Sequence, residues 1–162
     1  MLGRWGLLLC LAALLEAAPA HAERNCWIEA GARYRIDPGL LYAIAQLESG
    51  LNPRALGRNR DGSRDVGLMQ INSSHLPLLA RYGIGEEQLY DPCVSIHVAA
   101  WLLAGNFQRM GHSWTAVGAY NAASPGKRSL YASKIYRQLD PQTAARLTGA
   151  IDGASSREAP QR

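Results

Sequence analysis

Two Asp-Pro dipeptides, Asp37-Pro38 and Asp91-Pro92, each precede a run in which apolar residues recur at helical spacing. An aspartate at the N-cap position accepts a hydrogen bond from a free backbone amide of the first helical turn. Proline suits the next position because its fixed φ is helical and it has no N–H to leave unpaired. The dipeptides therefore predict two helix starts, one for a helix over residues 37–48 and one for a longer helix that ends at Gly111.

The rest of the chain is also dominated by helical patterns. No run of residues alternates apolar and polar side chains as convincingly as a half-buried strand does. Further helices are predicted over residues 25–35, 74–81, 114–122 and 130–139. The expected fold class is therefore all-α or α-dominated α+β, with a small hairpin in residues 58–72 left open.

Glu48 is the last residue of the helix predicted over residues 37–48, and it shares a stripe with apolar side chains. Leu41, Ile44 and Ala45 precede it in an i, i+3, i+4 pattern that Glu48 completes at i+7. Burial against such neighbours disfavours the ionised carboxylate, and so does the negative end of the helix dipole. A carboxylic acid kept protonated near neutral pH suits general-acid catalysis, although taken alone the residue is better explained as a surface glutamate in the last helical turn.

Two further short segments follow Glu48-Ser49 in the chain. Residues 67–72 read Gly-Leu-Met-Gln-Ile-Asn, and residues 119–122 read Ala-Tyr-Asn-Ala. The three segments, in this order, resemble the lytic transglycosylases, which are lysozyme-like enzymes that cleave peptidoglycan. The resemblance extends from about Cys26 to about Leu139. It implies a single lysozyme-like domain.

Each of these residue types has a property that a sugar-cleaving site needs. Gly67 allows close approach of the backbone, and Met69 offers a polarisable apolar wall that would help to keep Glu48 neutral. Gln70 has both a donor and an acceptor for amino-sugar groups, and the Tyr120 hydroxyl is expected to orient the Glu48 carboxyl. Singly, these residues are better explained as core and turn residues, and it is the set that favours a site.

The resemblance implies a role for each matching residue. Glu48 corresponds to the single catalytic acid and base. The predicted substrate-binding residues are Ser49, Gly67, Leu68, Met69, Gln70, Tyr120 and Asn121. The expected reaction breaks the MurNAc-GlcNAc bond, after which the muramic 6-hydroxyl attacks intramolecularly and leaves a 1,6-anhydro end. One residue suffices because the acid becomes the base after its first proton transfer, and no cofactor or metal is implied.

Two positions depart from the family pattern. Members often have a serine about nine residues after the glutamate, where this chain has Gly57, and Asn59 or Ser63 in the following polar loop is a candidate substitute. The tyrosine motif usually continues into glycine, whereas here it continues into Ala122-Ala123. The first departure leaves open whether Asn59, Ser63 or nothing replaces the hydroxyl, and the second puts the conformation of the loop in question more than the chemistry.

Residues 1–22 have the pattern of a cleaved secretory signal peptide. Arg4 precedes an apolar segment at residues 7–15, which is too short to span a bilayer, and Ala20-His21-Ala22 has the small-x-small form of a cleavage site. An uncleaved anchor is the alternative. The expected organisation is a signal peptide at 1–22, a lysozyme-like catalytic domain at 23–140 and a weakly structured C-terminal tail at 141–162, with the mature protein in the periplasm.

Only Cys26 and Cys93 remain after the signal peptide, and an even pair in an exported protein predicts a disulfide. The net charge of +4 favours encounter with an anionic polymer such as peptidoglycan. No nucleic-acid motif accompanies that charge, and the histidines lack metal-binding spacing. The charge excess is modest and is also typical of an ordinary solvated surface, so it is the family resemblance that implies glycan strands as the partner, with a secretion, conjugation or pilus complex as a second one.

Two functions other than that of a lytic transglycosylase are also compatible with these sequence features. A hydrolytic lysozyme would need a second carboxylate to activate water, and Asp65, next to the Gly67 loop, is the best candidate. A non-catalytic peptidoglycan-binding assembly component would have kept the fold and lost turnover. The small size, the signal peptide and the cysteine pair look most like the specialised transglycosylases that accompany secretion systems, conjugation machines and pili.

Overall fold

The computed structural model describes residues 18–157, and residues 1–17 and 158–162 lie outside it. Its long helices are α1 (Ala18–Tyr34), α2 (Pro38–Ser49), α4 (Pro92–Met110), α6 (Pro125–Gln138) and α7 (Pro141–Arg157). Shorter elements are α3 (Leu76–Leu79), α5 (Trp114–Gly118) and the 3-10 turns η1 (Ser73–His75), η2 (Ala80–Tyr82) and η3 (Glu87–Tyr90). With one small sheet, the fold is the α-dominated, lysozyme-like architecture that the sequence predicts.

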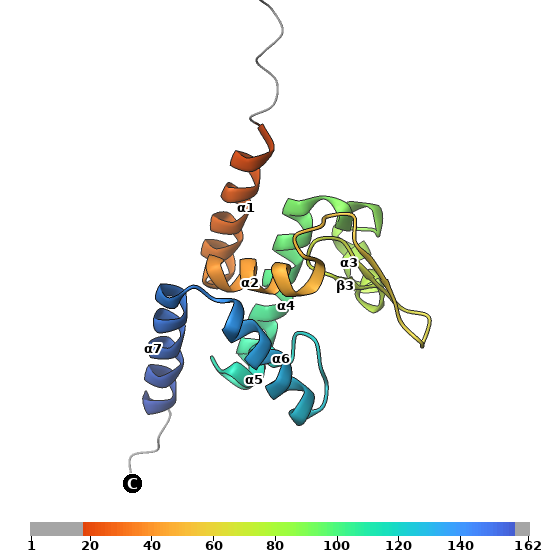
Figure 1. Cartoon of the computed structure of the whole chain (residues 1–162). Helices are drawn as coiled ribbons and strands as arrows, with labels where there is room; N and C mark the ends of the chain where they lie inside the picture. Colours follow the sequence, from red (N-terminus) through yellow and green to blue (C-terminus); the bar gives the residue numbers. More distant parts are fainter. Residues whose placement is uncertain (1–17, 158–162) are drawn as a thin grey trace, which may run out of the picture.

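Helix α4 runs behind α2 through the middle of the molecule (Figure 1). It packs against α1, α2 and α5, while α6 packs against α2 and α5. The core between these helices is apolar: Leu41 and Ile44 of α2, Ile96 and Leu103 of α4 and Ile135 of α6 are all fully buried. None of the helices in the described residues has the length and hydrophobicity needed to cross a membrane.

Both Asp-Pro helix starts are confirmed. The Asp37 carboxylate accepts a hydrogen bond from the Gly39 amide at 2.8 Å, and Asp91 accepts one from the Val94 amide at 3.0 Å. Helix α2 ends at Gly50, which adopts a left-handed φ of 61°. The caps therefore fix both ends of the helix that carries Glu48.

The hairpin left open by the sequence is present as a three-stranded antiparallel sheet. Strands β1 (Leu56–Arg58), β2 (Arg64–Val66) and β3 (Ile71–Asn72) pair in the order β1-β2-β3. In this register Asp65 of β2 lies opposite Gly57 on one side and Asn72 on the other. The sheet and α3 lie at one side of the molecule, at the right in Figure 1.

Some predicted boundaries were wrong. Helix α6 begins at Pro125, five residues before its predicted start, because Pro125-Gly126, a dipeptide that is also typical of turns, here forms the first turn of the helix, where proline is favoured. Helix α5 ends at Gly118 rather than at Ala122. Helix α1 begins at Ala18, so it includes the end of the predicted signal peptide, most of which lies outside the described residues.

The predicted disulfide is present between Cys26 and Cys93, whose Cα atoms lie 5.3 Å apart. Cys26 belongs to α1 and Cys93 to the first turn of α4. The bond therefore ties the two helices together across a separation of 67 residues.

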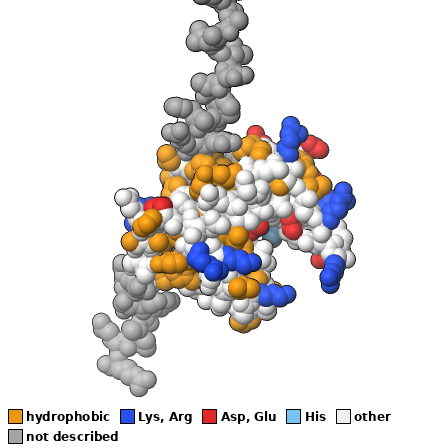
Figure 2. All heavy atoms as spheres, viewed as in Figure 1, with side chains coloured by type: hydrophobic (Ala, Val, Ile, Leu, Met, Phe, Trp, Pro, Cys, Tyr) orange, Lys and Arg blue, Asp and Glu red, His pale blue; other side chains and the backbone are white. Residues whose placement is uncertain are grey.

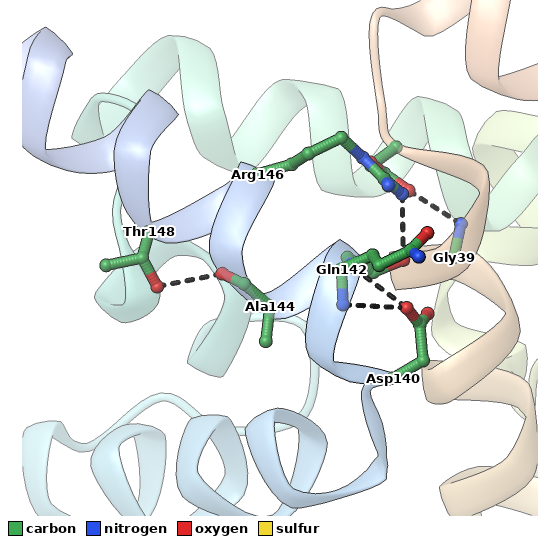
Figure 3. Close-up of polar contacts among 8 residues, drawn as sticks. Gly39, Asp140, Gln142, Ala144, Arg146 and Thr148 are labelled. Atoms are coloured by element: carbon green, nitrogen blue, oxygen red, sulfur yellow. Dashed lines mark hydrogen bonds and ion pairs between the residues drawn. The ribbon is translucent and has the colours of Figure 1, made fainter.

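The segment after Pro141 was expected to be weakly structured, but it forms α7. Asp140 accepts hydrogen bonds from the Gln142 and Thr143 amides, both at 3.0 Å, so Asp140-Pro141 is a third dipeptide of the kind that starts α2 and α4. Arg146 reaches back to Asp37 at 3.1 Å and joins α7 to the start of α2 (Figure 3). The last residues of the predicted tail, 158–162, lie outside the described part of the chain.

Candidate active site

Glu48 lies in the last turn of α2, and its carboxyl group is partly buried. The Tyr131 hydroxyl donates a hydrogen bond to Glu48 Oε1 at 2.5 Å. Burial raises the pKa of Glu48 to about 7, and the negative charge of Asp65 acts in the same direction, whereas the hydrogen bond from Tyr131 opposes it. At neutral pH the acid and its conjugate base are therefore present in comparable amounts, as a residue that acts first as acid and then as base requires.

The prediction that Tyr120 orients the Glu48 carboxyl was wrong. The Tyr120 hydroxyl donates instead to the backbone carbonyl oxygen of Met69 at 2.9 Å. Tyr131, which sequence reasoning missed, provides the contact with Glu48, and its ring stacks on that of Tyr120 with centroids 6.5 Å apart. The available signal was that Tyr131 and Ile135 share one face of α6, since a tyrosine buried on an apolar face normally finds a partner for its hydroxyl.

Position 67 requires glycine because the backbone of Leu89 in η3 lies directly against it. Its φ is 76°, and a Cβ atom at this position would lie 2.1 Å from the carbonyl oxygen of Leu89 in η3. Its amide donates to the Ala55 carbonyl at 2.9 Å. The close approach predicted for Gly67 is thus made to the protein's own backbone, and it holds the loop at residues 67–70 against η3 and the sheet.

Leu68 and Met69 point into the core, with 3% and 0% of their surfaces exposed. The Met69 amide donates to the Ser95 hydroxyl of α4 at 3.1 Å, and its carbonyl accepts from Tyr120. The Ser49 hydroxyl donates to the Leu68 carbonyl at 2.7 Å and links the end of α2 to the loop. These contacts place the loop beside Glu48, and a direct role of any of them in binding substrate stays a prediction.

Gln70 is strained and internally bonded. Its φ is 49°, and its side-chain amide donates to the carbonyls of Gly67 at 2.9 Å and Ala55 at 3.3 Å. Its Oε1 atom lies 3.1 Å from the position that a Cβ atom at Gly57 would take. The space where family members often have a serine side chain is therefore occupied by Gln70 and, at 3.4 Å, by the Cβ of Asp65.

Asp65 is held by a polar network on the sheet. Its two carboxylate oxygens accept hydrogen bonds from the amide groups of Asn59 at 2.9 Å and Asn72 at 2.8 Å. Asn59 also bonds to Ser63 at 3.0 Å. The two residues considered as substitutes for the missing serine thus brace the hairpin and Asp65.

A pocket of about 480 Å³ opens beside the tyrosine motif. Its lining includes Tyr120 and Asn121, together with residues of α4 and the start of α6: Asn106, Arg109, Met110 and Arg128. Figure 2 shows the surface hollowed between the sheet and the α6 side, with acidic side chains at the hollow and basic side chains on both flanks. Among the described residues no three His, Cys, Asp or Glu side chains are grouped so as to hold a metal ion.

Comparison with known proteins shows the family to which the chain belongs. The family described as "Transglycosylase SLT domain" matches residues 25–136. The Invasion protein IagB of Salmonella typhimurium is 50% identical over 131 residues, which cover 76% of this chain and 82% of that protein. Protein IpgF of Shigella flexneri is 47% identical over 130 residues (77% and 86%), and the X polypeptide of Escherichia coli K12 is 43% identical over 141 residues (83% and 82%).

Proposed function

Because this chain belongs to the transglycosylase SLT family and is a peptidoglycan lytic transglycosylase, we propose that Glu48 is its single catalytic acid and base. Cleavage leaves two new strand ends: one is a GlcNAc residue with a free hydroxyl group, and the other is a 1,6-anhydro-MurNAc residue. The observation that carries the proposal is the partly buried Glu48 carboxyl group, which is bonded to Tyr131 and has a pKa of about 7. Such a group is a competent acid at neutral pH and a competent base once it has lost its proton.

In the first step the protonated Glu48 donates its proton to the glycosidic oxygen. The bond from that oxygen to the muramic C1 breaks, and GlcNAc leaves with a hydroxyl group. The N-acetyl carbonyl oxygen of the muramic residue attacks C1 as the bond breaks, as the family resemblance implies. The hydrogen bond from Tyr131 stabilises the carboxylate that this step leaves behind.

In the second step the Glu48 carboxylate removes the proton from the muramic 6-hydroxyl. That oxygen attacks C1 and displaces the N-acetyl oxygen, which closes the 1,6-anhydro ring. Glu48 ends the cycle protonated, and no water is consumed. The Tyr131 hydroxyl holds the carboxyl group in one orientation through both transfers.

The glycan strand is proposed to lie over the loop at residues 67–70 and the tyrosine motif. Within this surface the side chains with free polar atoms are the best candidates for sugar contacts. They are Gln70, whose Oε1 accepts no bond among the described residues, and the exposed Asn121. Ser49, Gly67, Leu68, Met69 and Tyr120 shape the surface from below through the contacts described above.

The protein is proposed to be exported by a cleaved signal peptide at residues 1–22 and to act in the periplasm through a catalytic domain at 23–140. The Cys26–Cys93 disulfide suits an oxidising compartment. A role in opening the wall for an envelope-spanning machine, such as a secretion, conjugation or pilus complex, is proposed from the similarity to a protein named for invasion.

The decisive experiment treats purified peptidoglycan with three proteins: mature protein (residues 23–162), its Glu48→Gln variant and its Asp65→Asn variant. Mass spectrometry of the soluble fragments distinguishes anhydro ends from hydrolysed ends, which are one water heavier. Anhydro ends from the unmutated protein and from Asp65→Asn, with none from Glu48→Gln, are the expected result.

Hydrated ends that disappear in Asp65→Asn would overturn the proposal and make the protein a lysozyme with Asp65 as its base. Asp65 is near enough to influence Glu48, but both of its oxygens are already bonded to asparagines, which is why this is the second candidate. Binding without any fragments, unchanged in Glu48→Gln, would indicate a non-catalytic wall-binding component.

A further inference from the structure

Two arginines line the pocket beside Tyr120, and neither has an acidic partner in the part of the chain that the structure describes. Arg109 of α4 and Arg128 of α6 both line it. The ion pairs found among the described residues are Arg64–Glu86 and Arg146–Asp37, and neither involves the pocket. Two guanidinium groups that face one cavity repel each other, so an anion between them would be favoured.

Both arginines are held in place by neighbouring groups. Arg109 donates to the Oδ1 atom of Asn106 at 2.5 Å, and Asn106 is 6% exposed and donates in turn to the Ala116 carbonyl. Arg128 donates through Nε to the Ala122 carbonyl at 3.0 Å and through one terminal nitrogen to the Met110 sulfur at 3.7 Å. Each guanidinium has five N–H donors, so most of them remain for a ligand.

The start of α6 adds to the positive potential. This helix begins at Pro125, between Ala123 and Arg128, which both line the pocket. Ser124 at its N-cap makes no side-chain hydrogen bond to the free amides of the first turn. The positive end of the helix dipole therefore lies at the edge of the pocket and reinforces the two arginines.

The pocket and the candidate catalytic acid share a wall. Tyr120 lines the pocket and stacks on Tyr131, which bonds to Glu48. Arg128 precedes Tyr131 by three positions on α6, so the two side chains emerge from neighbouring points of one helix face. An anion in the pocket would therefore lie close to a sugar bound at Glu48.

From this arrangement we propose that the pocket binds a carboxylate of the peptide stem attached to the muramic residue, so that the enzyme prefers peptide-bearing glycan strands. This rests on the proposed function. The stem is joined to the sugar through a lactyl group and carries several carboxylates, so its anionic groups are fixed near the bond to be cleaved. An open pocket of about 480 Å³ suits part of such a substituent, whereas a protein partner would need a much larger surface.

The test compares two forms of one substrate: glycan strands with intact peptide stems, and the same strands after an amidase has removed the peptides. The variant is Arg109→Gln/Arg128→Gln. Its control is Arg81→Gln/Arg137→Gln, which removes the same charge at two exposed arginines outside the pocket lining. Formation of anhydro ends gives kcat and KM for each protein on each substrate.

We expect the unmutated protein and the control to favour the peptide-bearing strands. The pocket variant should lose about 10- to 100-fold in kcat/KM on these strands, mainly through KM, because each lost charge-assisted hydrogen bond weakens binding substantially. On peptide-free strands the variant should match the unmutated protein, which also shows that it is folded. The single variant Arg109→Gln, which leaves the bond from Arg128 to Ala122 intact, should show part of the same selective loss.

An equal loss on both substrates, or no loss on either, would overturn the inference. The proposed function fails separately: the unmutated protein would then give hydrated ends, or no fragments, from both substrates. Anhydro ends formed at the same rate from both substrates would reject the peptide-stem site alone.

Discussion

The hydroxyl of Tyr131 and the carboxyl of Glu48 are 2.5 Å apart although 83 residues separate them in the chain. One comes from the middle of α6 and the other from the end of α2, and these helices pack against each other. The bond opposes the effect of burial on the pKa of Glu48. The packing of two helices thus sets both the orientation and the acidity of the proposed catalytic group.

Activity should fall as the pH rises through about 7, because Glu48 must be protonated to donate to the leaving oxygen. In Tyr131→Phe the carboxylate loses a stabilising hydrogen bond, so the pKa rises and this limb of the profile of kcat/KM should move to higher pH. The rate should also fall about 10- to 100-fold as orientation is lost. Tyr120→Phe, which removes a bond to Met69 rather than to Glu48, is the matched control and should leave the limb in place.

Glu48→Gln should stabilise the protein at alkaline pH. The folded-state pKa of about 7 exceeds the ordinary glutamate pKa of 4.5, so ionisation is harder in the folded state and stability falls as the pH rises from 4.5 to 7. The full cost, at most about 3 kcal/mol, is present above pH 7 and absent below pH 4.5. Urea unfolding at pH 4 and pH 8 should show the variant's advantage only at pH 8. Glu87→Gln, at an exposed residue, should show no such difference, and an equal effect of Glu48→Gln at both pH values would contradict the assignment.

Gly67→Ala should destabilise the fold by about 3 kcal/mol or more, because a Cβ atom would overlap the Leu89 carbonyl oxygen in addition to the strain of a positive φ. Gly50→Ala has a similar φ of 61° and nothing within 4 Å, so it should show only the backbone strain, about 1 kcal/mol. Urea unfolding of both variants separates the two effects. Equal losses would show that η3 moves aside without penalty.

Reduction of the Cys26–Cys93 disulfide should lower the free energy of unfolding by about 4 kcal/mol, as the chain-entropy relation gives for a loop of 67 residues. Urea unfolding with and without a reductant measures the difference. In the variant Cys26→Ser/Cys93→Ser the reductant should change nothing. A large effect of the reductant on that variant would mean that the effect does not come from this bond.

The parts of the fold that the sequence predicted well are those with local signals. The caps at Asp37 and Asp91 and the stops at Gly50 and Gly111 depend on neighbouring residues alone, so the bounds of α2 and α4 were predicted closely. The same reasoning would have found α7 from Asp140-Pro141. Ala144, Leu147 and Ile151 follow that dipeptide at helical spacing and are partly buried, so the local signal for α7 was present.

The parts of the site that could not be predicted depend on contacts between distant segments. Glu48 could be placed on a buried stripe from its own helix, and burial is the main cause of its raised pKa. Its partner could not be named, because Tyr120 and Tyr131 are both tyrosines in the C-terminal half of the chain and only the packing of α6 on α2 decides between them. The requirement for glycine at position 67 could not be explained from the sequence either. It depends on contact with Leu89, which belongs to a turn that has no clear sequence pattern.

The large sequence separation of Tyr131 and Glu48 has a consequence for how refolding of the enzyme is followed after denaturation. Helices form from local contacts, whereas this bond exists only after residues 83 positions apart have come together. During refolding the return of helical circular dichroism therefore says little about the proposed active site. The return of wall-cleaving activity reports instead the long-range packing of α6 on α2, so turnover measures a step of folding that circular dichroism does not detect.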